Sequence, residues 1–341
     1  MFTDILIRAP VGLFPVLIFL VVLLYLDSYK LIRFKTILWV IASGALMTVL
    51  AYFVNGFLSE QLQIQVTNSS FPRYVSPISE EVLKALVIVL LFRLNRIGFL
   101  VDSAIMGFAV GAGFAFVENL YYLQSHGDAH IALWIVRGFG TAMMHGAVTA
   151  IFAIMSQSLT ERHMKINPIL YVPGLVAAIT LHSAFNHFLL PPILMTLCIL
   201  VFFPLVLTIV FRKSAAHMHE WLELDFDADA RLLYQINSGE FAESKIGLFL
   251  HDLRDKFDGP VVVDMLCYLR LYTELALRAK GVLMMRENGL DVPVGDRTRE
   301  KFTEMEYLEN SIGKTGLLAL RPFLHMTRKD LWQLYVLEDS D

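Results

Sequence analysis

Long apolar runs dominate the first two thirds of this chain and predict a helical membrane bundle. Seven runs approach or exceed the roughly 20 residues that a membrane-spanning helix needs. Backbone groups inside a bilayer must be hydrogen-bonded within the protein, so an α-helix is expected for each run. The fold class is therefore all-α, a polytopic bundle of about seven spans at residues 10–26, 37–58, 78–92, 98–123, 131–157, 168–190 and 192–211.

The charge distribution divides the chain into two parts. Hydrophobic residues make up 56% of the 341 residues, but no long apolar run follows Phe211. Residues 1–212 carry 12 Lys and Arg against 9 Asp and Glu, whereas residues 213–341 carry 16 against 23. We expect a transmembrane helical domain at 1–212 and a helical cytoplasmic domain at 213–341. The acidic balance of the second part argues against nucleic-acid binding.

Basic residues in the short loops predict the orientation of the bundle, because cytoplasmic loops are enriched in Lys and Arg. Arg8 and Arg73 would lie on one side and nine basic residues on the other. We therefore expect the N-terminus outside and the C-terminus in the cytoplasm. With Arg8 as its only early basic residue, the first span is not expected to be a cleaved signal peptide. The nine cytoplasmic basic residues are Lys30, Arg33, Lys35, Arg93, Arg96, Arg162, Lys165, Arg212 and Lys213.

Ionisable side chains interrupt four of the predicted spans. A charged side chain at the centre of a bilayer costs roughly 2.5–3.5 kcal/mol on insertion scales, so such residues are rare and mark functional sites. The alternating directions of the spans place all of these side chains in the outer half of the membrane. We therefore expect them to form one site. They are Glu80, Glu81 and Lys84 in the third span, Glu118 in the fourth, His145 in the fifth and His182 in the sixth.

Several of these residues also have a structural interpretation. Acids at the start of the third span are favoured by the helix dipole, with Lys84 in position for an ion pair within the helix. A single histidine such as His145 is often a hydrogen-bond partner between membrane helices. We interpret Arg137 either as a counter-charge to a carboxylate or as an interfacial residue whose charge extends to the membrane surface, and Asp102 as a helix N-terminal acid.

The order of these motifs resembles the PrsW family of intramembrane proteases, within the wider group that contains the CAAX prenyl endopeptidases. The resemblance implies a protease-like membrane domain, in the inner membrane of a bacterium, that hydrolyses a single-pass membrane protein such as an anti-sigma factor. The cytoplasmic tail lies outside the resemblance, and we expect it to dock a regulatory protein. The motifs lie within residues 78–187 and read Glu80-Glu81-x-x-Lys84, Phe114-x-x-x-Glu118-Asn119, His145 and His182.

The chain departs from the wider group at one position. The second motif of that group is usually Phe-x-x-x-His, and here Glu118 replaces the histidine. The third motif, His-x-x-x-Asn, is matched by His182 and Asn186. The catalytic residues that the resemblance implies are Glu80, Glu81, Glu118, His145, His182 and Asn186, with Lys84 in a supporting role.

Two chemistries remain open for this set of residues. In a zinc-dependent form, His145, His182 and Glu118 hold the metal, and a glutamate activates its water. In a metal-free form, Glu80 is the general base on water, and His182 with Asn186 donates to the developing oxyanion. The absence of a His-Glu-x-x-His helix favours the metal-free form.

A different class of function uses the same residues. An ion- or proton-coupled transporter also carries Glu and His inside its spans. Such a path should continue to the cytoplasmic face, where spans four to six are apolar apart from Asp102. No inverted repeat is evident in the chain, which also argues against a transporter.

Two segments outside the spans have less specific predictions. Residues 59–77 are polar and irregular, and are interpreted either as a gate beside the glutamates or as a connecting loop. In the C-terminal part, apolar residues at helical spacing predict helices over Val261–Arg286, Leu317–Leu324 and Leu331–Leu337.

Overall fold

The protein is predominantly helical in the part of the chain that the structure describes. The computed structural model describes residues 2–27, 32, 34–126, 128–160, 167–287, 290, 296–320 and 323–324. All regular structure in these ranges is helical, which confirms the all-α prediction. Contacts divide the chain into two compact units, Met1–Ser214 and Ala215–Asp341. The predicted division lies between residues 212 and 213.

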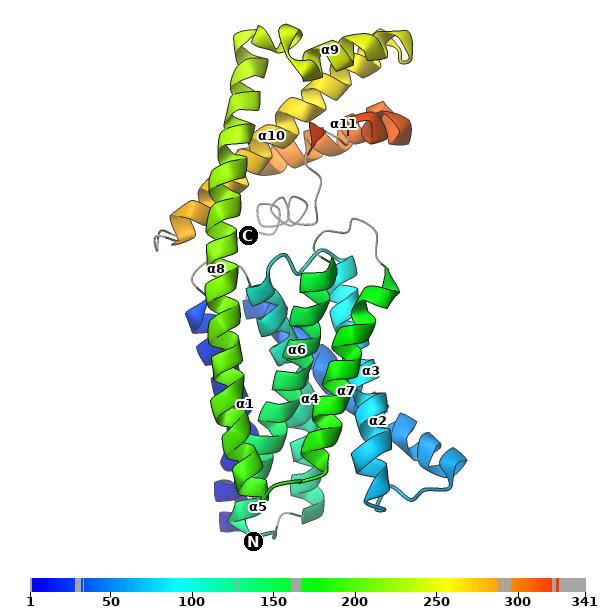
Figure 1. The fold of residues 1–341 in the computed structure, drawn as a ribbon, viewed down its shortest axis with the longest axis vertical. Helices are drawn as coiled ribbons and strands as arrows, with labels where there is room; N and C mark the ends of the chain where they lie inside the picture. Colours follow the sequence, from blue (N-terminus) through cyan, green and yellow to red (C-terminus); the bar gives the residue numbers. More distant parts are fainter. Residues whose placement is uncertain are drawn as a thin grey trace. The chain divides into compact units, whose positions relative to one another are not determined.

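The first unit is a bundle of long helices that run alongside one another (Figure 1). Short π-helical or 3₁₀ turns interrupt three of its connections. The helices are α1 (Phe2–Leu26), α2 (Phe34–Leu62), α3 (Ser76–Arg93), α4 (Leu100–His126), α5 (Ile131–Ile135), α6 (Ala142–Thr160), α7 (Val172–Asn186) and α8 (Pro192–Ser238), and the turns are η1 (Phe71–Val75), η2 (Val136–Thr141) and η3 (Pro168–Tyr171).

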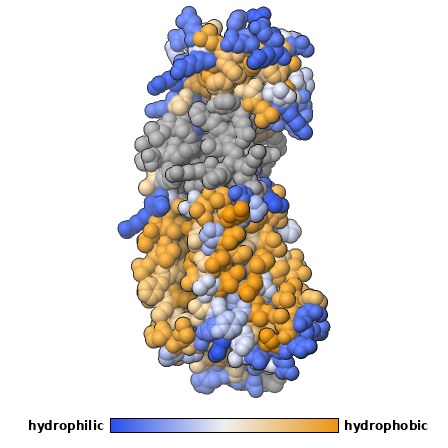
Figure 2. All heavy atoms as spheres, turned by 45° about the vertical axis from the view of Figure 1, so that its right-hand side comes forward, coloured by the Kyte–Doolittle hydropathy of each residue, from blue (hydrophilic) through white to orange (hydrophobic). Residues whose placement is uncertain are grey.

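Six helical stretches of the described residues are long and apolar enough to cross a membrane, and the chain is an integral membrane protein. The exact number of seven spans is not confirmed, because α3 is not among these six. Four charged side chains lie within its 18 residues: Glu80, Glu81, Lys84 and Arg93. Helix α3 nevertheless packs inside the bundle, against α2, α4, α6 and α7. Figure 2 shows the broad hydrophobic band that this unit presents on the face drawn.

Helix α4 forms the centre of the bundle, and its small residues let the neighbouring helices approach closely. Residues 101–115 of α4 are buried without interruption. A Cβ atom at Gly111 would lie 2.2 Å from the carbonyl oxygen of His145, and one at Gly113 would lie 2.1 Å from that of Ile41. Small residues at such positions are typical of membrane helix interfaces. The two glycines bring α6 and α2 against opposite faces of α4.

The directions of the helices bring the predicted site residues to one end of the bundle. Glu80 lies near the start of α3 and His145 near the start of α6. Glu118 and His182 lie toward the ends of α4 and α7. Neighbouring helices alternate in direction, so starts and ends meet at the same level, as the sequence predicted.

The second unit is a smaller helical assembly with its own apolar core. Helix α10 (Gly259–Glu287) confirms the helix predicted over Val261–Arg286 and packs against α11 (Asp296–Leu320). The predicted segment at 317–324 belongs in part to α11, and the one at 331–337 lies outside the described residues. The remaining elements are the end of α8, η4 (Glu240–Glu243), α9 (Lys245–Asp252) and η5 (Leu253–Asp255).

Candidate active site

The tandem glutamates at the start of α3 lie in different environments. Pro77 stands at the start of α3, directly after η1, and its missing N–H leaves a carbonyl of η1 without its helical donor. Successive residues of an α-helix are separated by about 100° around its axis, so Glu80 and Glu81 must point in different directions. The side chain of Glu81 is 2% exposed, whereas that of Glu80 is 13% exposed. The pair is therefore not interchangeable.

Glu81 is held between two partners in the core. Its Oε1 atom lies 2.5 Å from the Nζ atom of Lys84 and 2.7 Å from the Nδ1 atom of His182. The ammonium of Lys84, whose side chain is fully buried, also lies 4.7 Å from the ring centroid of Phe114. A buried carboxylate and a buried ammonium need such pairing, because neither has water around it. Glu81 is thus held in the core by Lys84 and accepts a hydrogen bond from Nδ1 of His182.

The hydrogen bonds around His145 assign its tautomer. The Nδ1 atom lies 3.1 Å from the ammonium of Lys84, which can only donate. The Nε2 atom lies 3.1 Å from Oε2 of Glu118, which as a carboxylate can only accept. The network therefore assigns a hydrogen to Nε2 and a lone pair to Nδ1. For His182, the contact of Nδ1 with Glu81 assigns the hydrogen to Nδ1 and leaves the lone pair on Nε2.

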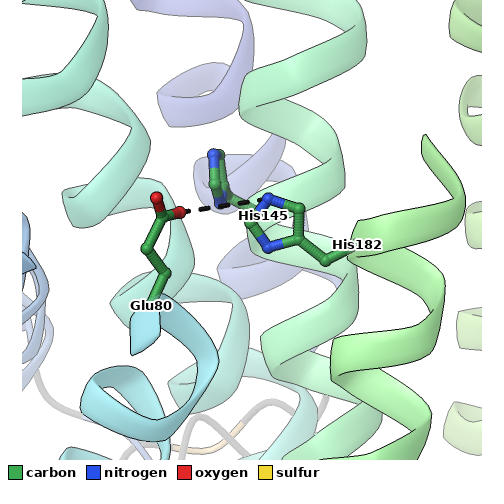
Figure 3. Close-up of side chains that lie close together, drawn as sticks. All are labelled: Glu80, His145 and His182. Atoms are coloured by element: carbon green, nitrogen blue, oxygen red, sulfur yellow. Dashed lines mark ion pairs between the residues drawn. The ribbon is translucent and has the colours of Figure 1, made fainter. Parts of the chain in front are cut away.

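Glu80, His145 and His182 converge from three helices, α3, α6 and α7 (Figure 3). One ligand atom of each residue lies within 4.8 Å of the others. The two imidazole rings are nearly perpendicular, with centroids 4.8 Å apart. The Oε2 atom of Glu80 lies 3.9 Å from Nε2 of His182, which is too long for a hydrogen bond. A shared water can bridge such a separation.

The chemistry of this donor set fits a zinc ion. Two histidines and one carboxylate form a known catalytic zinc set. Two ligand atoms that each lie about 2 Å from a tetrahedral zinc are about 3.3 Å from each other, so the 3.9 Å between Oε2 of Glu80 and Nε2 of His182 would have to shorten on binding. Histidine ligands usually donate their outer N–H to a carboxylate, and Glu118 and Glu81 accept from His145 and His182 in this way. The Nδ1 atom of His145 already has Lys84 as its partner, so a metal would have to displace that ammonium.

Glu118 lies behind His145, between it and a buried arginine. Its Oε1 atom lies 3.3 Å from Nη2 of Arg137, and the two form an ion pair. The interpretation of Arg137 as a counter-charge to a carboxylate is confirmed by this contact. In the structure Glu118 therefore contacts His145 from the side, while Glu80 is the carboxylate that lies near both His145 and His182.

Asn186 binds a neighbouring segment rather than the Glu80–His145–His182 group. Its Nδ2 atom donates to the carbonyl oxygen of Pro72 at 2.8 Å. Ser183 of the same helix donates to the carbonyl oxygen of Arg73 at 2.6 Å. Both acceptors belong to η1, within the segment predicted to be either a gate or a loop. The end of α7 thus holds η1 beside the site.

One residue near the site was not found by sequence reasoning. Asn55 of α2 contacts Oε1 of Glu80 through its Nδ2 atom at 3.4 Å, and its Oδ1 atom accepts from Ser79 at 2.5 Å. The signal in the sequence that could have identified Asn55 was its polar amide side chain inside the apolar run at 37–58. Asp102 is confirmed as a helix N-terminal acid, since it accepts from the backbone N–H groups of Gly98 and Phe99.

Comparison with known proteins gives a family match over the part of the chain that carries these residues. A family model described as PrsW family intramembrane metalloprotease matches residues 33–209, which is more than half of the chain and includes all of the predicted site residues. No curated protein and no solved structure matches the chain.

Proposed function

The chain belongs to the PrsW family of intramembrane metalloproteases and is an intramembrane protease, and on that basis we propose that Glu80, His145 and His182 form its catalytic centre. The observation that carries the proposal is the convergence of these three side chains from three helices, with one ligand atom of each within 4.8 Å of the others. Their positions in a membrane bundle support a substrate that is itself membrane-anchored. A soluble peptide would have to enter an apolar environment to reach them.

Glu80 is proposed to activate the water that attacks the peptide bond. The span of 3.9 Å between Glu80 Oε2 and His182 Nε2 suits one water molecule. Glu80 takes a proton from this water while the water oxygen forms a bond to the carbonyl carbon of the substrate. The carbon–nitrogen bond then breaks, and the proton passes from Glu80 to the leaving nitrogen. Glu81 and Lys84 hold His182 and His145 in orientation throughout.

A zinc ion at this centre would be held by Glu80, His145 and His182, the donor set that the geometry favours. When bound, zinc would polarise the scissile carbonyl and lower the pKa of a bound water. The metal set proposed from the sequence, with Glu118 in place of Glu80, uses a carboxylate that is engaged by both His145 and Arg137. In the zinc-dependent form Glu81 and Glu118 would still orient His182 and His145, whereas Lys84 would be displaced from Nδ1 of His145.

The substrate is proposed to be cut near the extracytoplasmic end of its membrane helix. The bias of basic loop residues supports an outer location for the end of the bundle that carries the site. A helical backbone is internally hydrogen-bonded, so the scissile segment must unwind before water can attack it. A membrane-anchored anti-sigma factor, in a bacterial inner membrane, is the proposed class of substrate.

The proposal is tested with the full-length protein and a panel of single-pass substrates in lipid nanodiscs. Glu80→Gln and His182→Ala should abolish cleavage while the protein stays folded. Glu60→Gln is the matched control, because Glu60 is an exposed glutamate in the last turn of α2. Full activity of both site variants would refute the assignment. Loss of wild-type activity on chelation, restored by zinc, distinguishes the zinc-dependent chemistry from the metal-free one.

A further inference from the structure

A polar chain behind the site connects His145 to helix α1. Helix α1 lies outside the segment that the family model matches, which begins at residue 33. The chain runs from His145 to Glu118, then to Arg137 and Asn119, and ends on the backbone of Gly12. Each link joins buried or partly buried side chains, so each is protected from competition by water.

Arg137 is held by three neighbouring residues of α4. Its Nε atom donates to Oδ1 of Asn119 at 2.8 Å, and its Nη2 atom lies 3.3 Å from Oε1 of Glu118. The guanidinium carbon lies 3.5 Å from the ring centroid of Tyr122, a close cation–π contact. These contacts use the charge, the Nε–H donor and the flat face of the guanidinium, so lysine cannot replace it.

Asn119 uses both ends of its amide. Its oxygen accepts from Arg137, while its Nδ2 atom donates to the carbonyl oxygen of Gly12 at 2.7 Å and lies 3.4 Å from that of Arg137. The reverse orientation would place an N–H group against the Arg137 donor. The amide is therefore oriented by its partners, and it joins α1 to η2.

Helix α1 contacts η2 directly through its backbone. Pro15 has no N–H, so the carbonyl of Val11 lacks its usual helical donor. Gly138 of η2 fits against this carbonyl, since a Cβ atom there would lie 2.0 Å from the Val11 oxygen. The next carbonyl along α1 is that of Gly12, which accepts from Asn119. The hydrogen bond between Asn119 and Gly12 therefore lies beside a backbone contact between α1 and η2 that involves Pro15 and Gly138.

The π-helical turn η2 explains how Arg137 and His145 reach the same carboxylate. In an unbroken α-helix, residues eight apart are separated by about 80° around the axis. One extra residue absorbed by a π-bulge changes that separation to roughly 20°. The turn lies at Val136–Thr141, between α5 and α6, and so brings Arg137 and His145 to one face of the helix. Glu118 then meets Arg137 with one oxygen and His145 with the other.

We propose that Arg137 and Asn119 are positioning residues that act through Glu118 on His145, with helix α1 as their anchor. The proposal rests on the proposed catalytic role of His145. Neither residue touches the Glu80–His182 gap. Their effect is to hold the Glu118 carboxylate where it accepts from Nε2 of His145, which keeps the lone pair on Nδ1, facing the ammonium of Lys84.

A double-mutant cycle tests this coupling in lipid nanodiscs. Arg137→Gln and Glu118→Gln should each lower kcat by about 10- to 100-fold with KM unchanged, as supporting residues of a site do. The double variant should be no slower than Glu118→Gln alone, because Arg137 acts through that carboxylate. Equal effects of Arg137→Gln in both backgrounds would refute the proposal. Arg93→Gln, an exposed arginine at the other end of α3, is the matched control.

A second measurement keeps the proposal testable apart from activity and from folding defects. In protein labelled with ¹⁵N-histidine, the His145 ring signals, identified with His145→Gln, should report hydrogen on Nε2. Arg137→Lys, which retains the charge, and Asn119→Leu should both shift these signals and lower kcat. Unchanged signals and wild-type kcat in both variants would overturn the proposal. If wild-type protein cleaves no substrate, the proposed function fails, while the ring signals still decide whether the chain orients His145.

Discussion

Removal of the buried ammonium of Lys84 should destabilise the bundle more than its simultaneous removal with Glu81. In Lys84→Met, the Glu81 carboxylate stays in the core with His182 as its remaining partner. Breaking a buried pair on one side costs about 3–5 kcal/mol, because it leaves an uncompensated charge. Glu81 and Lys84 lie on the same helix, so their ion pair does not itself hold two helices together. The loss of folding free energy arises because the packed bundle keeps water away from the unpaired carboxylate of Glu81.

The double variant Lys84→Met/Glu81→Gln should recover most of this loss. Glutamine at position 81 has no charge, and its side-chain oxygen can still accept from Nδ1 of His182. Replacing a buried ion pair as a whole is often neutral, so we expect stability within about 1 kcal/mol of the wild type. Catalysis should not recover, since Lys84 also orients His145.

Reversible unfolding in mixed micelles, followed by tryptophan fluorescence during titration with SDS, measures these differences in free energy. Lys35→Met is the matched control, because Lys35 is exposed at the start of α2, and its free energy of unfolding should change by less than about 0.5 kcal/mol. A double variant as unstable as Lys84→Met would contradict the reasoning. A cost below about 1 kcal/mol for Lys84→Met alone would do the same.

Three further predictions follow from single contacts. Asn55→Ala should lower kcat by about 10-fold with little change in KM, because the substitution removes the contact that holds the Glu80 carboxylate against α2. Steady-state kinetics measure both constants, and a raised KM with unchanged kcat would contradict this prediction. Gly111→Ala should destabilise the bundle, since the new Cβ atom would lie 2.2 Å from the His145 carbonyl oxygen, whereas Gly56→Ala, with open space around it, should not; equal melting temperatures would contradict this. Burial and the hydrogen bond to Glu309 raise the pKa of Tyr268, so the second unit should lose stability as pH rises above about 10, where the unfolded tyrosine ionises. Tyr268→Phe should reduce that alkaline loss in circular-dichroism melts, and an unchanged pH dependence would show that another group is responsible.

Much of the site could be predicted from the sequence because the membrane makes ionisable residues conspicuous. Glu80, Glu118, His145 and His182 stand out in apolar runs, and the alternation of span directions places them at one end of the bundle. The structure agrees on this convergence, and the family match covers the same segment. Asn55 was missed because a single amide in an apolar run has many structural explanations.

The sequence by itself determined the fold class, the membrane helices and the set of residues from which the site is built. These follow from span length and from the cost of charge in a bilayer, and both act on local stretches of chain. Only the tertiary structure decided which carboxylate lies close to both histidines, because that depends on how each helix is rotated about its axis. Glu80 and Glu81 differ by about 100° of rotation, and the π-helical turn η2 reorients Arg137 relative to His145. Such rotations are set by packing against neighbouring helices, through contacts such as Gly111 with His145 and Gly138 with Val11, which link positions far apart in the chain.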